Sequence, residues 1–130
     1  MRKIEQAMVD AIRQRTYRNL GNTRVCPAER QDGKPLALVY LHDNHIATIG
    51  YRVGMVREDD GFQREHYHVK NVSVSLAGWP TRTTVSRLSA ILRTFGADLR
   101  GVYTRKGEVY WYRRGGKDER CLRSTEWVSG

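Results

Sequence analysis

The stretch that decides the fold is residues 78–93, which reads Gly78-Trp79-Pro80-Thr81-Arg82-Thr83-Thr84-Val85-Ser86-Arg87-Leu88-Ser89-Ala90-Ile91-Leu92-Arg93. Pro80 is tolerated just before a helix but not inside one, and the threonines after it can accept hydrogen bonds from first-turn N–H groups. Apolar residues then recur at helical spacing on one face: Val85, Leu88, Ile91, Leu92 and Phe95. The stretch therefore predicts the end of a strand, a corner filled by Trp79 as a core residue, and a helix at about 83–95.

The opposite face of this helix combines cations with hydroxyl groups. At about 100° per residue it carries Arg82, Ser86, Ser89 and Arg93. A row of this kind suits a phosphate backbone, and it is also the composition of an ordinary solvated helix face. The pattern leaves both interpretations open.

Working outward, residues 1–18 carry an apolar stripe that predicts an N-terminal helix: Ile4, Ala7, Met8, Ala11 and Ile12. A short strand at 23–29, ended by Pro27, and a buried strand at 36–41 are expected next. The pair Asp43-Asn44 suits the tight turn of a hairpin that continues as a strand at 46–53.

A charged loop is expected at 57–65, followed by an alternating strand at 66–76. One face of that strand is predicted to carry His66, His68, Lys70, Val72, Val74 and Leu76. Beyond the helix, residues 102–112 predict a second hairpin that turns at Lys106-Gly107. Residues 121–128 add a last short strand or pack across the sheet.

These elements predict an α+β fold in a single domain, 1–130: an antiparallel sheet of five to six strands packed against the N-terminal helix and the helix at about 83–95. A chain of 130 residues is long enough to bury its own core. No run of 18 apolar residues is present, and the N-terminal residues lack the apolar centre of a signal peptide, so we expect a cytoplasmic protein. Reduced thiols are then expected at Cys26 and Cys121.

The charge is the strongest global indication of function. Lys and Arg number 23 against 14 acids, which gives a formal net charge of +9. Eighteen of the 23 cations are arginines, whose planar groups pair with phosphate or carboxylate through two hydrogen bonds. We expect a polyanionic partner or an acidic patch on a partner protein.

The hairpin at 102–112 and the arginines after it interleave aromatic and cationic side chains. Tyr110, Tyr112 and Arg114 are predicted to share one strand face, with Val109, Trp111 and Arg113 on the other. Because Val109 accompanies Trp111, we expect that face to be buried and the tyrosine face to be exposed. Tyrosines and arginines on an exposed sheet can stack unpaired bases and hold phosphates.

Metal binding and catalysis are weakly indicated. His42, His45, His66 and His68 would form a site only if the two histidine pairs converge. The run His42-Asp43-Asn44-His45 contains residue types of a metal-dependent nuclease, but consecutive residues of a turn point in different directions. No phosphate-cradling loop or dinucleotide fingerprint is present, so we expect no cofactor, no metal and no enzymatic activity.

Two segments, Val39-Tyr40-Leu41-His42-Asp43-Asn44-His45-Ile46-Ala47 and Ser75-Leu76-Ala77-Gly78-Trp79-Pro80-Thr81-Arg82-Thr83-Thr84, resemble motifs of small uncharacterised tailed-phage proteins. Residues 87–92 continue this resemblance, which implies a phage or prophage origin. It carries no activity and no catalytic residues to this chain.

The sequence therefore predicts a non-catalytic basic binding protein of phage type, whose partner is DNA, RNA or a nucleic-acid-bound host complex. The alternative is a protein–protein inhibitor of a host enzyme or defence system, of the anti-CRISPR kind, because tyrosine, tryptophan and arginine are also preferred anchors of protein interfaces. The candidate binding residues are Arg82, Ser86, Arg87, Ser89, Arg93, Arg105, Tyr110, Tyr112, Arg113 and Arg114.

Overall fold

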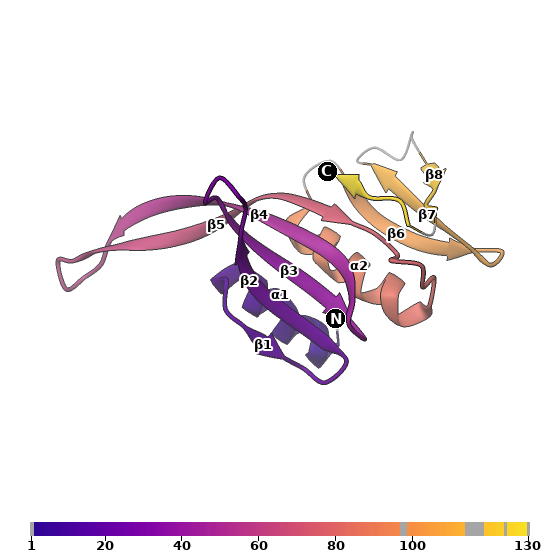
Figure 1. Cartoon of the computed structure of the whole chain (residues 1–130), viewed down its shortest axis with the longest axis horizontal. Helices are drawn as coiled ribbons and strands as arrows, with labels where there is room; N and C mark the ends of the chain where they lie inside the picture. The colour runs from indigo at the N-terminus through magenta and orange to yellow at the C-terminus, as the bar shows by residue number, and fades with distance from the viewer. Residues whose placement is uncertain (1, 97–98, 114–118, 124, 130) are drawn as a thin grey trace.

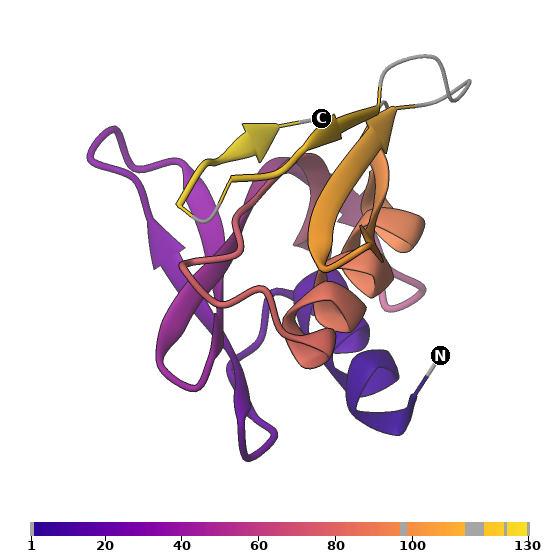
Figure 2. The ribbon, with the colours of Figure 1, turned by 90° about the vertical axis from the view of Figure 1, so that its right-hand side faces the viewer.

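Helix α2 (Arg82–Phe95) lies between two antiparallel sheets in the computed structural model of the chain (Figure 1). The structure describes residues 2–96, 99–113, 119–123 and 125–129. Helix α1 (Lys3–Gln14) packs beside α2 and against the larger sheet, and Figure 2 shows the two sheets on different sides of the helices. The predicted α+β class is confirmed.

The larger sheet has six strands in the order β1-β2-β3-β4-β5-β9, and the smaller has three in the order β6-β7-β8. Their bounds are β1 Arg18–Asn19, β2 Thr23–Glu29, β3 Pro35–Leu41, β4 Asn44–Arg57, β5 Gln63–Val74, β6 Leu99–Arg105, β7 Glu108–Arg113, β8 Glu119–Cys121 and β9 Val128–Ser129. The hairpin predicted after α2 thus forms a sheet of its own. The C-terminal segment contributes one strand to each sheet.

The core fills the space between these layers. Its fully buried side chains include Met8 and Ile12 of α1, Val25, Val39 and Ile49 of the larger sheet, and Leu88, Ile91 and Leu92 of α2. The Tyr51 hydroxyl donates a hydrogen bond to the Ile12 carbonyl near the end of α1. Burial raises the pKa of Tyr51 far above its usual range, so this hydroxyl stays a donor at neutral pH.

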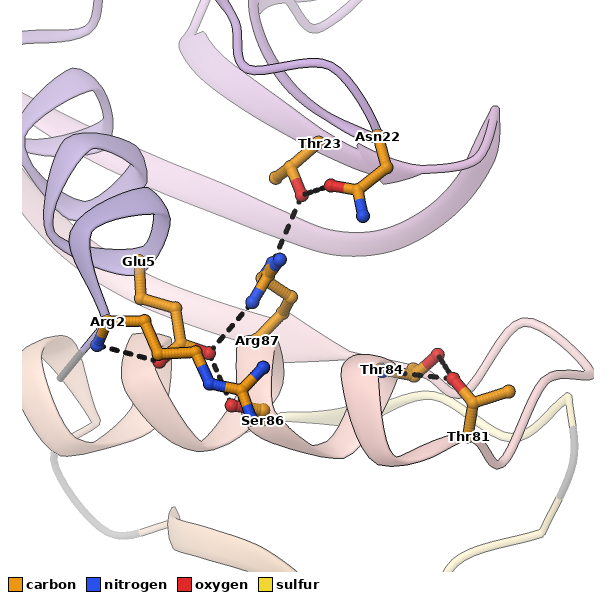
Figure 3. A network of polar contacts seen from close by, with 8 residues as sticks. All are labelled: Arg2, Glu5, Asn22, Thr23, Thr81, Thr84, Ser86 and Arg87. Carbon is orange, nitrogen blue, oxygen red and sulfur yellow. Dashed lines mark hydrogen bonds and ion pairs between the residues drawn. The ribbon is translucent and has the colours of Figure 1, made fainter.

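A buried ion pair joins the two helices (Figure 3). Arg87 of α2 is 3% exposed; its Nη1 lies 3.0 Å from Glu5 Oε2, and its Nε donates to Thr23 Oγ1 at 3.1 Å. The Ser86 hydroxyl donates to the same carboxylate. Burial alone would raise the pKa of Glu5, but the hydrogen bonds from Ser86, the Arg2 N–H and Arg87, with the charge of Arg87, hold it below its ordinary value.

Strands β4 and β5 run on past the rest of the larger sheet as a two-stranded ribbon, residues 51–69, which we call the arm (Figure 1). The predicted charged loop at 57–65 is therefore shorter, because β4 continues to Arg57 and β5 begins at Gln63. The loop of the arm, residues 58–62, is closed by backbone hydrogen bonds between Glu58 and Phe62 and between Gly61 and Glu58.

A β-bulge changes which face of β5 is buried. Gly50 pairs with Asn71 and Tyr51 with Val69, so one extra residue, Lys70, is inserted on β5. Tyr67 and Val69 consequently pack against the core, on which Val72 and Val74 also lie. The prediction that His66, His68 and Lys70 share the face of Val72 is wrong, because strict alternation cannot anticipate an inserted residue.

Helix α1 is shorter than the predicted 1–18. It ends at Gln14 because Arg15 adopts a left-handed conformation, with φ of 53°. The Arg15 side chain donates to the carbonyls of Ala28 and Leu36 and stacks over the Tyr67 ring. These contacts with the sheet end the helix before Gly21, the residue at which the sequence suggested a stop.

Two local predictions about strands are also corrected. Pro27 lies inside β2, paired with Ala37, at a point where β1 no longer covers the other edge of that strand; an edge tolerates proline because no ladder hydrogen bond is lost there. The β3–β4 turn is formed by His42 and Asp43, both with positive φ, rather than by Asp43-Asn44.

Candidate nucleic-acid interface

Three tyrosines lie together on the outer face of the small sheet. The turn at Lys106-Gly107, with positive φ at both residues, fixes a register in which Tyr103 pairs with Tyr110. The Tyr103 and Tyr110 rings stack with centroids 5.7 Å apart, and Tyr112 lies 6.0 Å from Tyr103. We call Tyr103, Tyr110 and Tyr112 the tyrosine face.

Gly101 makes room for one of these rings. It pairs with Tyr112, and a Cβ atom at position 101 would lie 2.7 Å from the Tyr112 hydroxyl oxygen and 2.9 Å from ring carbons. The absence of a side chain therefore lets the Tyr112 ring lie across β6. The result is a cluster of three neighbouring rings, in which Tyr110 lies nearly parallel to Tyr103 (23°) and Tyr112 is tilted by 52°; a base stacks on a single ring face.

The tyrosine face lies in a strongly basic segment of the chain. Residues 99–123 contain eight Lys and Arg against three Asp and Glu, a net charge of +5. Arg105 is exposed at the end of β6, opposite Glu108. The Tyr110 hydroxyl donates to Glu108 at 3.0 Å, and this hydrogen bond and the charge of Glu108 raise the pKa of Tyr110.

The inner face of the same sheet packs on α2, as predicted. Val109 and Trp111 are buried, and the guanidinium of Arg113 lies over the Trp111 ring at 4.9 Å. Arg113 therefore belongs to the inner side of the sheet and not to the tyrosine face. Arg114 lies outside the described residues.

The row of cations predicted along α2 does not form one surface. Arg82 and Arg93 are exposed, but they lie eleven residues apart along the helix, about 16 Å. Between them Ser86 donates to Glu5, and Ser89 donates to the Val102 carbonyl at 2.9 Å. Arg87 is buried against Glu5, so the prediction that it contacts a ligand is wrong: α2 is covered on several sides, and this cation is used inside the protein.

The four histidines do not converge. His42 and His45 lie at the β3–β4 turn, whereas His66 and His68 pair with Gly54 and Arg52 in the arm. His45 Nε2 donates to the Ala47 carbonyl, and burial lowers the pKa of the ring. Within the residues that the structure describes, no cluster of three or more His, Cys, Asp or Glu side chains is arranged to hold a metal ion.

Trp79 is 57% exposed, so its predicted place in the core is wrong. After Leu76 the chain makes a turn in which Ala77 and Gly78 both have positive φ, and this turn carries the indole outward. Trp79 becomes one wall of a largely apolar cavity of about 260 Å³. The other lining residues are Leu41, His42, Asn44, Ile46, Leu76, Thr81 and Thr84.

Sequence reasoning missed Tyr103 and Gly101 as site residues. The signal was present, because a two-residue turn at Lys106-Gly107 places Arg105 opposite Glu108 and hence Tyr103 opposite Tyr110. The role of Gly101 depends on a register shift between Leu99 and Gly101, which no local pattern reveals.

None of the helices in the described part of the chain combines the length and apolar character needed to cross a membrane. The fold and this surface define a small basic α+β protein with an aromatic sheet face. The chain belongs to the Kyanoviridae Gp96 protein family, a phage protein family, whose model matches residues 1–65 and 64–130. No curated protein and no solved structure matches it. The phage origin implied by the two motifs is thereby confirmed at the level of the family.

Proposed function

We propose that this phage-family protein binds nucleic acid, free or within a host complex, through the outer face of its small sheet and without catalysis. The observation that carries the proposal is the tyrosine face, which lies in a segment with a net charge of +5. Exposed aromatic rings stack bases of any sequence, and neighbouring arginines neutralise phosphates. The site of action is the cytoplasm of the host cell.

Unpaired strands fit this surface better than duplexes. A base can stack on a tyrosine only when its own face is accessible, as in single strands, loops and bulges. The three rings lie on two neighbouring strands, so a single strand would run across β6 and β7. Arg105, at the edge of the same face, would hold a phosphate.

The test is fluorescence anisotropy with four labelled ligands: single- and double-stranded DNA and RNA. Each is titrated at about 50 and about 200 mM salt, since phosphate contacts weaken steeply over this range. We expect tightest binding to a single-stranded ligand. No binding to any of the four at the lower salt overturns the proposal.

Two matched pairs of variants locate the surface. Tyr110→Ala should weaken binding about 5- to 150-fold, which corresponds to the about 1–3 kcal/mol of one stacked base. Tyr17→Ala is its control, because Tyr17 is an exposed tyrosine that precedes the larger sheet, whereas Tyr110 is half-buried in the small sheet. Arg105→Ala should reduce the salt dependence by about 0.7 in the log–log slope, and Arg18→Ala on β1 should leave it unchanged. If Tyr17→Ala weakens binding as much as Tyr110→Ala, or Arg18→Ala reduces the salt dependence as much as Arg105→Ala, the assignment of the surface is wrong.

The alternative function is inhibition of a host enzyme or defence system through a protein interface. The exposed apolar side chains of the arm favour this alternative, since such side chains are frequent in protein interfaces. A protein that ignores nucleic acid at low salt but binds one host protein with little salt dependence would support it.

A further inference from the structure

Among the residues that the structure describes, neither outer edge of the arm pairs with a further strand. Strand β3 pairs with β4 as far as Gly50, and from Tyr51 to Arg57 the one described strand that pairs with β4 is β5. The outward side of this segment therefore presents a row of backbone N–H and C=O groups that the described strands leave unpaired. Figure 1 shows the ribbon projecting from the body, away from both helices.

The middle of the β4 edge, residues 53–56, is apolar. Val53, Met55 and Val56 are 44%, 59% and 40% exposed. Natural proteins protect exposed edges with charged residues, and the outer edge of β5 follows that rule: its sequence over 63–70 is Gln-Arg-Glu-His-Tyr-His-Val-Lys. The β4 edge carries exposed arginines at its ends, Arg52 and Arg57, but no charged residue over 53–56, and an isolated two-stranded ribbon is marginally stable in water.

Charge argues against a nucleic acid as the partner of the arm. The arm contains three arginines against four acids, a net charge of −1, whereas the whole chain carries +9, so the remainder carries +10. An arm of this charge is not attracted to phosphates. Its arginines at 52 and 57 are followed by acids at 58–60, so an antiparallel second copy of the arm brings opposite charges together.

We propose that two copies of this chain dimerise by antiparallel pairing of their β4 edges, Val53–Arg57, into a four-stranded ribbon. A two-fold axis relates antiparallel copies of one strand, and each strand then presents the same patch to the other. With the axis at Met55, the two Met55 residues face each other. Arg52 of each copy then lies opposite Glu58 of the second copy, the first loop residue after β4, whose carboxylate also contacts His66 Nε2 at 2.8 Å in its own chain. Arg52 is exposed, and among the described residues it forms no ion pair.

Cysteine cross-linking tests this register. Directly opposite residues in an antiparallel pair have Cα atoms about 4.5–5.5 Å apart, which lies within the range that a disulfide spans. The variant Met55→Cys is made in a chain whose native cysteines are replaced, Cys26→Ser and Cys121→Ser. Oxidised glutathione should link two copies of it through a disulfide, and a reductant should break this bond. The matched control is His68→Cys, at an exposed position on the opposite edge of the arm. Equal cross-linking at both positions, or none at Met55→Cys, overturns the proposal.

Sedimentation velocity on the unmodified chain gives an independent measurement. We expect a monomer–dimer equilibrium that shifts between about 1 and about 100 µM protein. Met55→Lys should abolish the dimer, because a lysine on a bare edge blocks strand pairing. Phe62→Lys should preserve it, since Phe62 is 70% exposed but lies in the loop outside the paired segment. A chain that stays monomeric throughout, or a dimer lost in Phe62→Lys and kept in Met55→Lys, contradicts the proposal.

Discussion

Replacing Arg87 with methionine should cost much of the protein's stability. The guanidinium is 3% exposed, and it supplies both the charge that balances Glu5 and a hydrogen bond to Thr23. Methionine fills a similar volume without charge. Among the described residues, the substitution therefore leaves the buried carboxylate of Glu5 with the Ser86 hydroxyl and the Arg2 N–H as its donors.

The expected loss is about 3–5 kcal/mol, the range found when one member of a buried ion pair is removed. For a chain of this length it lowers the melting temperature by about 10–20 °C. Glu5→Met combined with Arg87→Met removes both charges together and should recover about 2 kcal/mol or more of the loss. Surface pairs provide the contrast: Asp10 and Arg13 are about half exposed, and Arg13→Met should cost at most about 0.5 kcal/mol.

Urea denaturation at two pH values is the assay. Because the pKa of Glu5 is lowered below 4.5 in the folded protein, its stabilisation is present above that pH and is lost as the pH falls through the folded pKa. In Arg87→Met the unbalanced carboxyl should instead have a raised pKa and gain stability on protonation. The difference in the free energy of unfolding between the unmodified protein and Arg87→Met should therefore become smaller as the pH falls from 7 to about 4. A loss below about 1 kcal/mol, or a difference independent of pH, would refute this account.

Two further predictions concern α2 and the tyrosine face. Thr81→Ala should destabilise the protein by about 0.5–2 kcal/mol in thermal denaturation, because Thr81 accepts the Thr84 N–H at the start of α2; Thr83→Ala is the control and should cost less. Glu108→Gln should lower the pKa of Tyr110 toward its ordinary value, because the charge that opposes phenol ionisation is removed. Spectrophotometric titration measures it, and an unchanged tyrosine titration would contradict the assigned cause.

The elements of the fold could be predicted because their patterns are local. The apolar stripe of α2, the proline before it and the turn at Lys106-Gly107 each depend on neighbouring residues, and each was found close to its predicted position. Errors arose where a distant contact decided the local structure. Arg15 ends α1 through carbonyls of β2 and β3, and the inserted Lys70 is defined only by its pairing partners on β4.

The candidate site divides in the same way. Tyr110 and Tyr112 could be assigned to an outer face because Val109 and Trp111 mark the inner one. The burial of Arg87 and its ion pair with Glu5 could not be predicted from its position on the helix, since Glu5 lies 82 residues away in the sequence. Net charge predicts a basic surface only after such internal pairs are removed from the count.

The two motifs that carry the phage resemblance are explained by one part of the structure. Both supply residues with positive φ: His42 and Asp43 in the first, Ala77 and Gly78 in the second. Both also line the cavity beside Trp79. Left-handed conformations constrain the residue types at these turns, and the cavity constrains their apolar neighbours. The motifs therefore specify how β3 turns into β4 and how the chain enters α2, whereas the tyrosine face and the arm, which carry the proposed binding, lie outside both segments.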